Sequence, residues 1–273
     1  METIIGLGQA GCSIAEKFQQ YPQYTIYRLD SKKRTGTKFK LIPEQDSHEE
    51  YEQNCPSLKR FLKPVSGPCL VIIGGSGTIS GMSLRVLEQL KDNDLSVLYI
   101  KPDVSLLSEL KEKQERVVFH VLQQYARSGL LKRLYIVDNT KLENVVGDVS
   151  VIDYYDKLND LLVYTMHMIN VFNNSKPVMS TLSNPTNVAR ISTIGIVDFE
   201  KGEENFFYDL EAPRDKFYFY ALTEESLNKE GDLIKKIREQ VKKNEATYGI
   251  YSTKYEQNYI YAQINSNLIQ EEN

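Results

Sequence analysis

Short apolar runs alternate with amphipathic stretches through the first half of the chain. Residues 69–73 are continuously apolar and are followed by glycines, which is typical of a strand buried on both faces. Residues 104–129 instead repeat their apolar positions every three to four residues, as a helix does. By these criteria we expect strands at residues 3–5, 24–29, 69–73, 95–100 and 134–137, and helices at 13–20, 82–90 and 104–129. The alternation predicts right-handed βαβ units, and therefore an α/β fold with a mostly parallel, Rossmann-like sheet.

The second half of the chain has a different pattern of predicted elements. Residues 148–172 predict one long central helix with Asp148 as its N-cap, and the segment rich in Pro, Ser, Thr and Asn that follows is the expected domain boundary. Beyond it, tyrosine-rich strands at 205–210, 216–222, 246–253 and 258–265 surround one helix at 227–243. We therefore expect an α/β domain at 1–147, the central helix at 148–172, an inter-domain loop and helix at 173–198, and a small α+β domain at 199–273.

Composition narrows the class of protein. The chain has 273 residues, of which 41% are hydrophobic and 26% charged, and its formal net charge is -4. This is the balance of a globular protein and argues against direct nucleic-acid binding. The three cysteines follow no metal or disulfide spacing, and no segment has the length and apolarity of a membrane span or the pattern of a signal peptide. We expect a cytoplasmic protein with no membrane partner and no metal site of its own.

A first glycine motif lies between the first predicted strand and helix. Gly6, Gly8 and Gly11 form a G-x-G-x-x-G pattern, and Asp30 follows at the end of the second strand. Glycines let a backbone approach a phosphate closely, while a helix N-terminus supplies free N–H groups. Taken alone, this pattern indicates the dinucleotide site of an NAD-dependent oxidoreductase.

A second glycine motif changes this interpretation. Residues 74–81, Gly-Gly-Ser-Gly-Thr-Ile-Ser-Gly, follow the apolar strand and open another helix, but they contain no lysine and so are not a Walker P-loop. Two helix N-termini at the carboxyl edge of one sheet favour a shared polyphosphate ligand.

These motifs resemble the tubulin/FtsZ superfamily. Residues 8–11, Gly-Gln-Ala-Gly, are similar to the GQAG or GQCG of tubulin's first nucleotide loop, and residues 75–81 match the signature G-G-G-T-G-[ST]-G at five of seven positions. Residues 137–142 resemble the segment that supplies a guanine-reading Asn, and residues 155–159 resemble tubulin's YGDLN. The resemblance covers residues 2–200 in order and is greatest to compact, divergent tubulin-like proteins of the phage or plasmid type.

The resemblance implies a GTP or GDP site, with Mg²⁺ as a further candidate ligand. Tyr155 and Asn159 are four residues apart and share a helix face, so the ring could stack on a base whose edge the amide reads. From the residues alone, a core role for Tyr155 stays equally open. The expected nucleotide residues are Gly8, Gln9, Ala10, Gly11, Cys12, Gly75, Ser76, Gly77, Thr78, Ile79, Ser80, Gly81, Asn139, Tyr155 and Asn159.

The sequence also departs from the superfamily. In members that hydrolyse GTP, a loop after the central helix carries an acid to the neighbouring subunit's nucleotide, but no Asp or Glu lies between Leu161 and Val197. Asn184 and Asn187 stand about where acids are expected, so we assign no catalytic residue and expect slow or absent hydrolysis. Ile79 replaces a signature glycine. The five acids at residues 44–52 fit either a Mg²⁺ site or a solvated surface.

Three functions remain open at this point. The first is a cytoskeletal protein that forms head-to-tail filaments with itself or with a related filament subunit. The second is a non-polymerising, GTP-binding regulator of the same fold. The third is the NAD-dependent oxidoreductase, which would use Asp30 and would have no use for Asn139, Tyr155 or Asn159.

Overall fold

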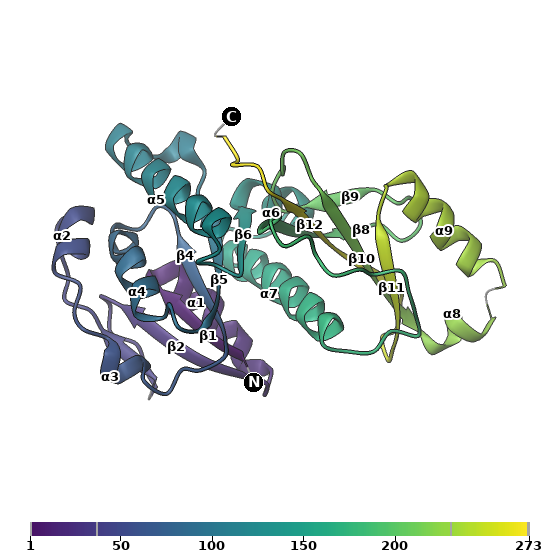
Figure 1. The fold of residues 1–273 in the computed structure, drawn as a ribbon, viewed down its shortest axis with the longest axis horizontal. Helices are drawn as coiled ribbons and strands as arrows, with labels where there is room; N and C mark the ends of the chain where they lie inside the picture. The colour runs from purple at the N-terminus through teal and green to yellow at the C-terminus, as the bar shows by residue number, and fades with distance from the viewer. Residues whose placement is uncertain (1, 37, 230, 272–273) are drawn as a thin grey trace. The chain divides into compact units, whose positions relative to one another are not determined.

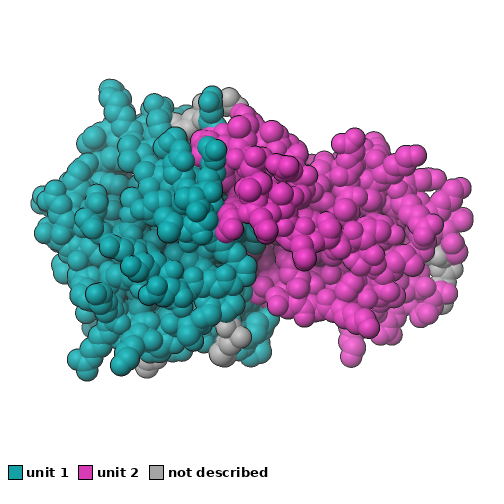
Figure 2. All heavy atoms as spheres, viewed as in Figure 1, with its two compact units in different colours: residues 1–163, 271–273 teal, residues 164–270 magenta. Residues whose placement is uncertain are grey.

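The computed structural model describes residues 2–36, 38–229 and 231–271. The chain forms two compact units, shown in Figure 2: Met1–Val163 with Glu271–Asn273, and Tyr164–Gln270. The division falls inside the long helix α7 (Tyr154–Asn173).

The first unit is built on a parallel sheet. Its strands, in spatial order, are β3 (Phe39–Leu41), β2 (Tyr24–Asp30), β1 (Glu2–Leu7), β4 (Pro68–Gly74), β5 (Asp94–Lys101) and β6 (Arg133–Asp138). Every neighbouring pair in this series is parallel. β1 and β4 lie side by side, with Ile5 opposite Val71, and the apolar residues 69–73 of β4 are buried as expected. The predicted α/β class with a mostly parallel sheet is confirmed.

Helices connect these strands (Figure 1). They are α1 (Gly8–Lys17), α2 (His48–Gln53), α3 (Lys59–Leu62), α4 (Ser83–Gln89), α5 (Glu109–Ser128) and α6 (Asn139–Val146), with short 3-10 helices η1 (Phe18–Gln20), η2 (Thr78–Met82) and η3 (Val104–Leu106). The stretch expected as one helix from 104 to 129 is therefore η3 and α5, and α5 ends at Gly129, whose φ is 85°. α1 begins at Gly8, five residues before the predicted start. α2, α3 and α6 were not predicted.

The central helix begins later than expected. α7 starts at Tyr154, after a turn at residues 151–153, so the prediction of Asp148 as its N-cap is wrong. Ser150 and Asp153 instead bind each other, with Ser150 Oγ donating to Asp153 Oδ2 at 2.7 Å. The carbonyl of Asp153 accepts the N–H of Lys157 at 2.9 Å, which puts Asp153 at the N-cap position directly before the helix.

The second unit has a mixed sheet. Its strands, in spatial order, are β8 (Ile191–Val197), β12 (Tyr259–Ser266), β10 (Asp215–Thr223), β11 (Thr247–Thr253) and β7 (Met179–Ser180), and β9 (Glu204–Phe206) pairs with β8. β10 and β11 are parallel, while the other pairs are antiparallel. The expected strand at 205–210 is only β9, and β8 lies within the segment 173–198 where no strand was predicted.

Two helices replace the single one expected at 227–243. They are α8 (Glu224–Lys229) and α9 (Leu233–Lys243), and α9 buries Leu233, Ile237 and Val241 in one core with Tyr218 and Tyr220. Many tyrosines of this unit are thus core residues. In the described part of the chain, no helix combines the length and apolarity needed to cross a membrane.

Candidate nucleotide site

The first glycine loop is the junction between β1 and α1, with no residue between them. Gly8 has a φ of 71°, a left-handed conformation that glycine adopts without strain. A Cβ on Gly6 would lie 2.5 Å from the carbonyl oxygen of Gly11, and one on Gly11 would collide with the carbonyl of Ile72 in β4. Gly6 and Gly11 therefore allow α1 to pack tightly on the sheet. The expected reason for Gly11, close approach to a phosphate, is not the one that the structure shows.

Cys12 points away from the loop surface. Its thiol donates to the carbonyls of Gly6 at 3.3 Å and Leu29 at 3.5 Å, and burial raises the pKa of this thiol to about 12. The side chain therefore stays neutral and inside the core, and only the backbone of Cys12 is left to meet a ligand. Gln9 and Ala10 are the exposed residues of this loop, at the N-terminal turn of α1.

The second loop divides into an anchored part and an open part. A Cβ on Gly75 would collide with the Tyr99 hydroxyl, and one on Gly81 with the carbonyl of His48. Ser80 is buried and donates its hydroxyl to the carbonyl of Gly77 at 2.6 Å. These contacts hold the buried side of the loop in place. The Ser80 side chain thus serves the loop itself.

Ser76 and Gly77 form the open part and are exposed. A Cβ on Gly77 would have Cγ2 of Ile79, at 3.8 Å, as its nearest neighbour, and the φ of Gly77 is -81°. A side chain would therefore fit there in the free protein. Thr78 is half-buried beside them. This is the part of the loop where a phosphate has room.

The two loops meet each other. Cγ2 of Ile79 lies 2.6 Å from the position that a Cβ on Gly8 would take, and the Cβ of Ala10 lies 3.2 Å from the corresponding position on Gly74. Ile79 is 9% exposed, so its side chain packs against the first loop. The isoleucine that departs from the signature therefore fills the space between the loops.

The expected base-binding residues come from α6 and α7. Asn139 opens α6 directly after β6, where Asp138 caps the helix by accepting the N–H and the hydroxyl of Thr140, both at 2.7 Å. Because carboxyl ends of parallel strands share one edge, Asn139 lies on the edge that carries both glycine loops. Tyr154 in α7 donates its hydroxyl to Glu143 of α6 at 2.8 Å, which ties the start of α7 to α6.

Tyr155 is 68% exposed and meets the ring of Tyr154 edge-on, with centroids 5.0 Å apart. It is therefore not a core aromatic, which removes that alternative. Asn159, one turn later, is half-buried. Within the described ranges, the amides of Asn139 and Asn159 make no hydrogen bond to another residue. Both are available to a ligand.

Asp30 is already engaged. Its side chain is 4% exposed, and Oδ2 accepts the Nε–H of Arg34 at 2.8 Å. A dehydrogenase would need this carboxylate for a ribose hydroxyl, so the geometry disfavours that role. Sequence analysis missed Arg34, although the three consecutive basic residues at 32–34, just after β2, were a visible signal.

The acidic segment at 44–52 is largely explained by α2. Ser47 caps this helix, because its hydroxyl oxygen accepts the N–H of Glu50 at 3.1 Å. The Glu50 carboxylate in turn accepts the N–H of Asp46 at 3.1 Å. Glu49 and Glu50 lie in the first turn, where negative charge is favourable. Among the described residues no group of three or more His, Cys, Asp or Glu could hold a metal ion. A Mg²⁺ ion would thus depend chiefly on phosphate oxygens and water.

The segment expected to carry the hydrolytic acids lies in the second unit. Asn184 and Asn187 are exposed. Thr186, between them, is held by Asp215 of β10, which accepts its N–H at 2.9 Å and its hydroxyl at 2.7 Å. Asp215 is a carboxylate at this loop that sequence analysis missed, because it comes from a distant strand. Both of its oxygens are used to anchor the loop.

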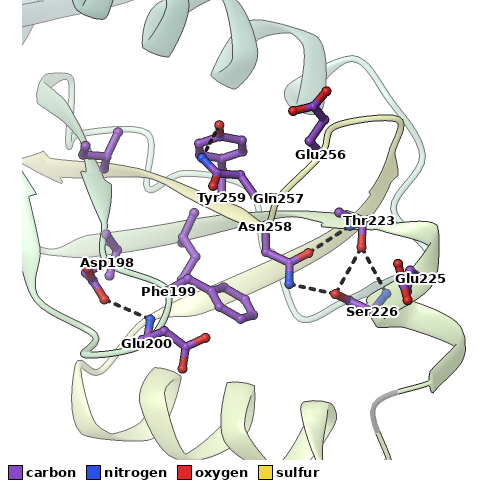
Figure 3. Close-up of a pocket in the computed structure, with 13 residues that line it drawn as sticks. Asp198, Phe199, Glu200, Thr223, Glu225, Ser226, Glu256, Gln257, Asn258 and Tyr259 are labelled. Carbon is purple, nitrogen blue, oxygen red and sulfur yellow. Dashed lines mark hydrogen bonds between the residues drawn. The ribbon is translucent and has the colours of Figure 1, made fainter.

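A separate cleft of about 680 Å³ lies in the second unit, at the ends of β8, β10 and β12 (Figure 3). Asn258 accepts the N–H of Thr223 and donates to Ser226 Oγ, both at 2.9 Å, so the amide of Asn258 is engaged within the protein. The cleft contains none of the predicted nucleotide residues.

Known structures resemble the whole chain, although no family model and no curated protein matches its sequence. A GTPγS-form protofilament of TubZ from Bacillus thuringiensis serovar israelensis has a TM-score of 0.73 and 16% identity, with 99% of this chain and 88% of that chain covered. The empty FtsZ dimer of M. jannaschii has a TM-score of 0.69 and 13% identity, over 97% of this chain and 87% of that chain. The chain has the tubulin/FtsZ fold.

A third known structure of this fold matches the chain with a similar TM-score, sequence identity and coverage. The GTPγS-bound protofilament of CetZ2 from Haloferax volcanii has a TM-score of 0.69 and 14% identity, over 97% of this chain and 92% of that chain. The expected resemblance is thereby confirmed at the level of the tubulin/FtsZ fold.

Proposed function

We propose that this protein binds guanine nucleotides and forms cytoskeletal filaments in the cytoplasm, with little or no GTP hydrolysis. The observation that carries the proposal is the contact between two glycine loops on one sheet edge, together with an exposed tyrosine on the helix beyond them. We assign GTP binding to residues 1–147 and the start of the central helix. We assign residues 199–273 as the smaller domain.

The phosphates would bind between the loops. Gln9, Ala10, Ser76 and Gly77 are exposed, and their backbone N–H groups would bind the phosphates. α1 adds the positive end of its dipole, and its first turn contains no acid. The two loops take their shape from close contacts within the protein, made by Gly8, Gly11, Gly75, Ile79 and Gly81. Mg²⁺ would be held mainly by the phosphates themselves.

The guanine would bind between α6 and α7. The ring of Tyr155 is exposed and not packed in the core, so a base would stack on it at little cost in desolvation of neighbouring groups. The amides of Asn139 and Asn159 each provide a donor and an acceptor, as the guanine edge requires. A base with the opposite pattern of donors and acceptors, such as adenine, would leave these amides unsatisfied.

Calorimetry with GTP, GDP, ATP and NAD tests the proposed ligand. Guanine nucleotides should bind more tightly than ATP or NAD, and Tyr155→Ala and Asn159→Ala should each cost about 1–3 kcal/mol of binding. Tyr154→Phe is the matched control, since it keeps the ring and loses only the bond to Glu143. Equal or tighter binding of ATP or NAD to the parent protein would contradict the proposal.

Filament formation is the second part of the proposal. It rests on the fold shared with the TubZ and CetZ2 protofilaments, and the assembly would be head to tail, with copies of itself or with a related subunit. The lack of acids at 161–197 favours one alternative, a non-polymerising GTP-binding regulator of this fold. Sedimentation with and without GTP separates the two: filaments pellet with nucleotide, whereas a regulator stays in the supernatant.

A further inference from the structure

Arg34 joins the first glycine loop to two carboxylates. Its Nη2 donates to the carbonyl of Gln9 at 3.2 Å, and its Nε donates to Asp30 at 2.8 Å. Its Nη1 lies 3.3 Å from both carboxylate oxygens of Glu16 in α1. One side chain therefore connects the loop that we assign to the phosphates with the acids behind that loop.

The charges of this cluster balance. Arg28 also pairs with Glu16, at 2.6 Å, so two guanidinium groups face two carboxylates. The side chains of Asp30, Arg28 and Arg34 are only 4%, 8% and 17% exposed. The side chain of Glu16 is 33% exposed, so removing the charge of Arg34 would leave a net charge of about -1 that water screens only in part.

The cluster is close enough to act on a bound phosphate. Within one residue the amide nitrogen and the carbonyl oxygen are less than about 4 Å apart, so the guanidinium lies within about 7 Å of the amide of Gln9. This is inside the screening length of about 8 Å at physiological ionic strength. A polyphosphate at the N-terminus of α1 would therefore respond to the charge balance of the cluster.

We propose that Arg34 is the charge-compensating residue of the phosphate site. It neutralises Asp30 and Glu16, so that a polyphosphate can approach the start of α1 without facing an unpaired carboxylate. The inference rests on the proposed function for the place of the phosphates, but it does not depend on which base is bound. A merely structural ion pair would make the same bonds and would not discriminate ligands by the number of their phosphates.

The test compares Arg34→Gln with the parent protein across guanosine, GMP, GDP and GTP by calorimetry. The loss of affinity should grow with each phosphate, from less than about twofold for guanosine to about tenfold or more for GTP, as expected for one unit charge at this range. Arg34→Lys keeps the charge and should retain most of the affinity for GTP.

Lys38→Gln is the matched control, because it removes the same charge from a neighbouring segment. The Lys38 ammonium lies 5.3 Å from the centre of the Tyr27 ring. Tyr27 and Arg28 are consecutive in β2 and point to opposite faces of the sheet, so Lys38 lies on the face away from Glu16. Its loss should change the affinity for GTP less than about twofold at this separation.

Two further variants test the sign of the effect. Arg34→Gln combined with Asp30→Asn restores the charge balance and should bring the affinity for GTP to within about threefold of the parent. Asp30→Asn alone makes the cluster positive and should tighten GTP a few-fold while leaving guanosine unchanged. This single variant keeps the test decisive if Arg34→Gln does not fold, which thermal unfolding without nucleotide reveals.

Equal losses for guanosine and GTP, or no loss for GTP, would overturn the role of Arg34. The proposed function fails on a different result. If the parent binds ATP as well as GTP, guanine recognition is wrong. Adenosine, AMP, ADP and ATP then replace the guanine ligands and test Arg34 in the same way. Inorganic tripolyphosphate provides a probe without any base. A parent protein that binds no polyphosphate would overturn both proposals.

Discussion

The glycines of the two loops have different roles, which the sequence motifs alone do not separate. A Cβ on Gly11 would collide with the carbonyl of Ile72 where α1 packs on β4, whereas a Cβ on Gly77 would meet only Cγ2 of Ile79, at an ordinary contact distance of 3.8 Å. A G-x-G-x-x-G pattern marks a tight strand–helix junction, and only the surrounding backbone shows whether a glycine makes room for protein or for a ligand.

Alanine at Gly77 should therefore affect nucleotide binding, whereas alanine at Gly11 should affect stability. Gly77→Ala should leave thermal unfolding unchanged and lower the affinity for GTP about tenfold or more, because its methyl group enters the space assigned to phosphate. Gly11→Ala should instead cost about 1–3 kcal/mol of stability through overpacking against Ile72. Calorimetry and thermal unfolding of both variants check this. Normal GTP binding by Gly77→Ala would show that the second loop is only a structural turn.

His167 in α7 should make stability depend on pH. It is 8% exposed, and burial lowers its pKa to about 4 from 6.5. The folded state keeps the imidazole neutral, while the unfolded chain takes up a proton below about pH 6.5, so the stability present above that pH is lost as the pH falls towards 4. Between pH 7 and pH 5 this group should cost about 2 kcal/mol.

Denaturant unfolding at the two pH values measures this loss. His167→Gln should remove most of it, whereas His120→Gln, on the exposed surface of α5, controls for the loss of a histidine. An undiminished loss of stability in His167→Gln would assign the effect to other groups.

At the scale of elements, strands were more predictable than helix ends. β4 and β5 are runs of apolar residues whose length and order define the parallel sheet. β8 escaped prediction because polar residues and Gly195 interrupt its apolar pattern. A Cβ on Gly195 would collide with the carbonyl of Asn205 in β9, so the glycine is required by a strand pairing that the local sequence does not reveal.

Helix starts depend on capping, which offers a matched pair of variants. Asp138 caps α6 through Thr140, so Asp138→Ala should cost about 0.5–2 kcal/mol of stability. Asp148 precedes the turn before α7 and is exposed, so Asp148→Ala should change stability by less than about 0.5 kcal/mol. Urea unfolding of the two variants compares them. Equal losses would mean that Asp148 also supports a helix start.

At the scale of the molecule, the alternating pattern was sufficient to predict the α/β class, and four motifs in order predicted the tubulin/FtsZ fold. The site was predictable only in part. The glycine loops follow β1 and β4 at the carboxyl edge of one sheet and Tyr155 is exposed in α7, but the inward thiol of Cys12 and the anchored hydroxyl of Ser80 could not be read from the motifs. Asp215 was missed because it contacts Thr186 from 29 residues away, whereas Arg34 was missed although its partner Asp30 is only four residues away.

The loop at 181–187 leads to the last prediction, on GTP turnover. It contains two exposed amides and no acid, and Asp215, a carboxylate that contacts the loop, is held by Thr186 through both oxygens. An amide orients water but does not accept its proton, so any filaments should be long-lived in GTP. Phosphate release, measured against protein concentration, should be slow for the parent.

Restoring carboxylates at the loop should accelerate that release. Asn184→Asp combined with Asn187→Asp should raise turnover, by up to about 10²–10⁴-fold for a well-positioned base. The gain should increase with protein concentration, because the acid would act on a neighbour's nucleotide. Asp215→Asn is the control for the carboxylate that anchors Thr186 of the loop, and it should leave the slow turnover unchanged. Brisk hydrolysis by the parent that Asp215→Asn abolishes would show instead that Asp215 leaves Thr186 on assembly and serves as the missing acid.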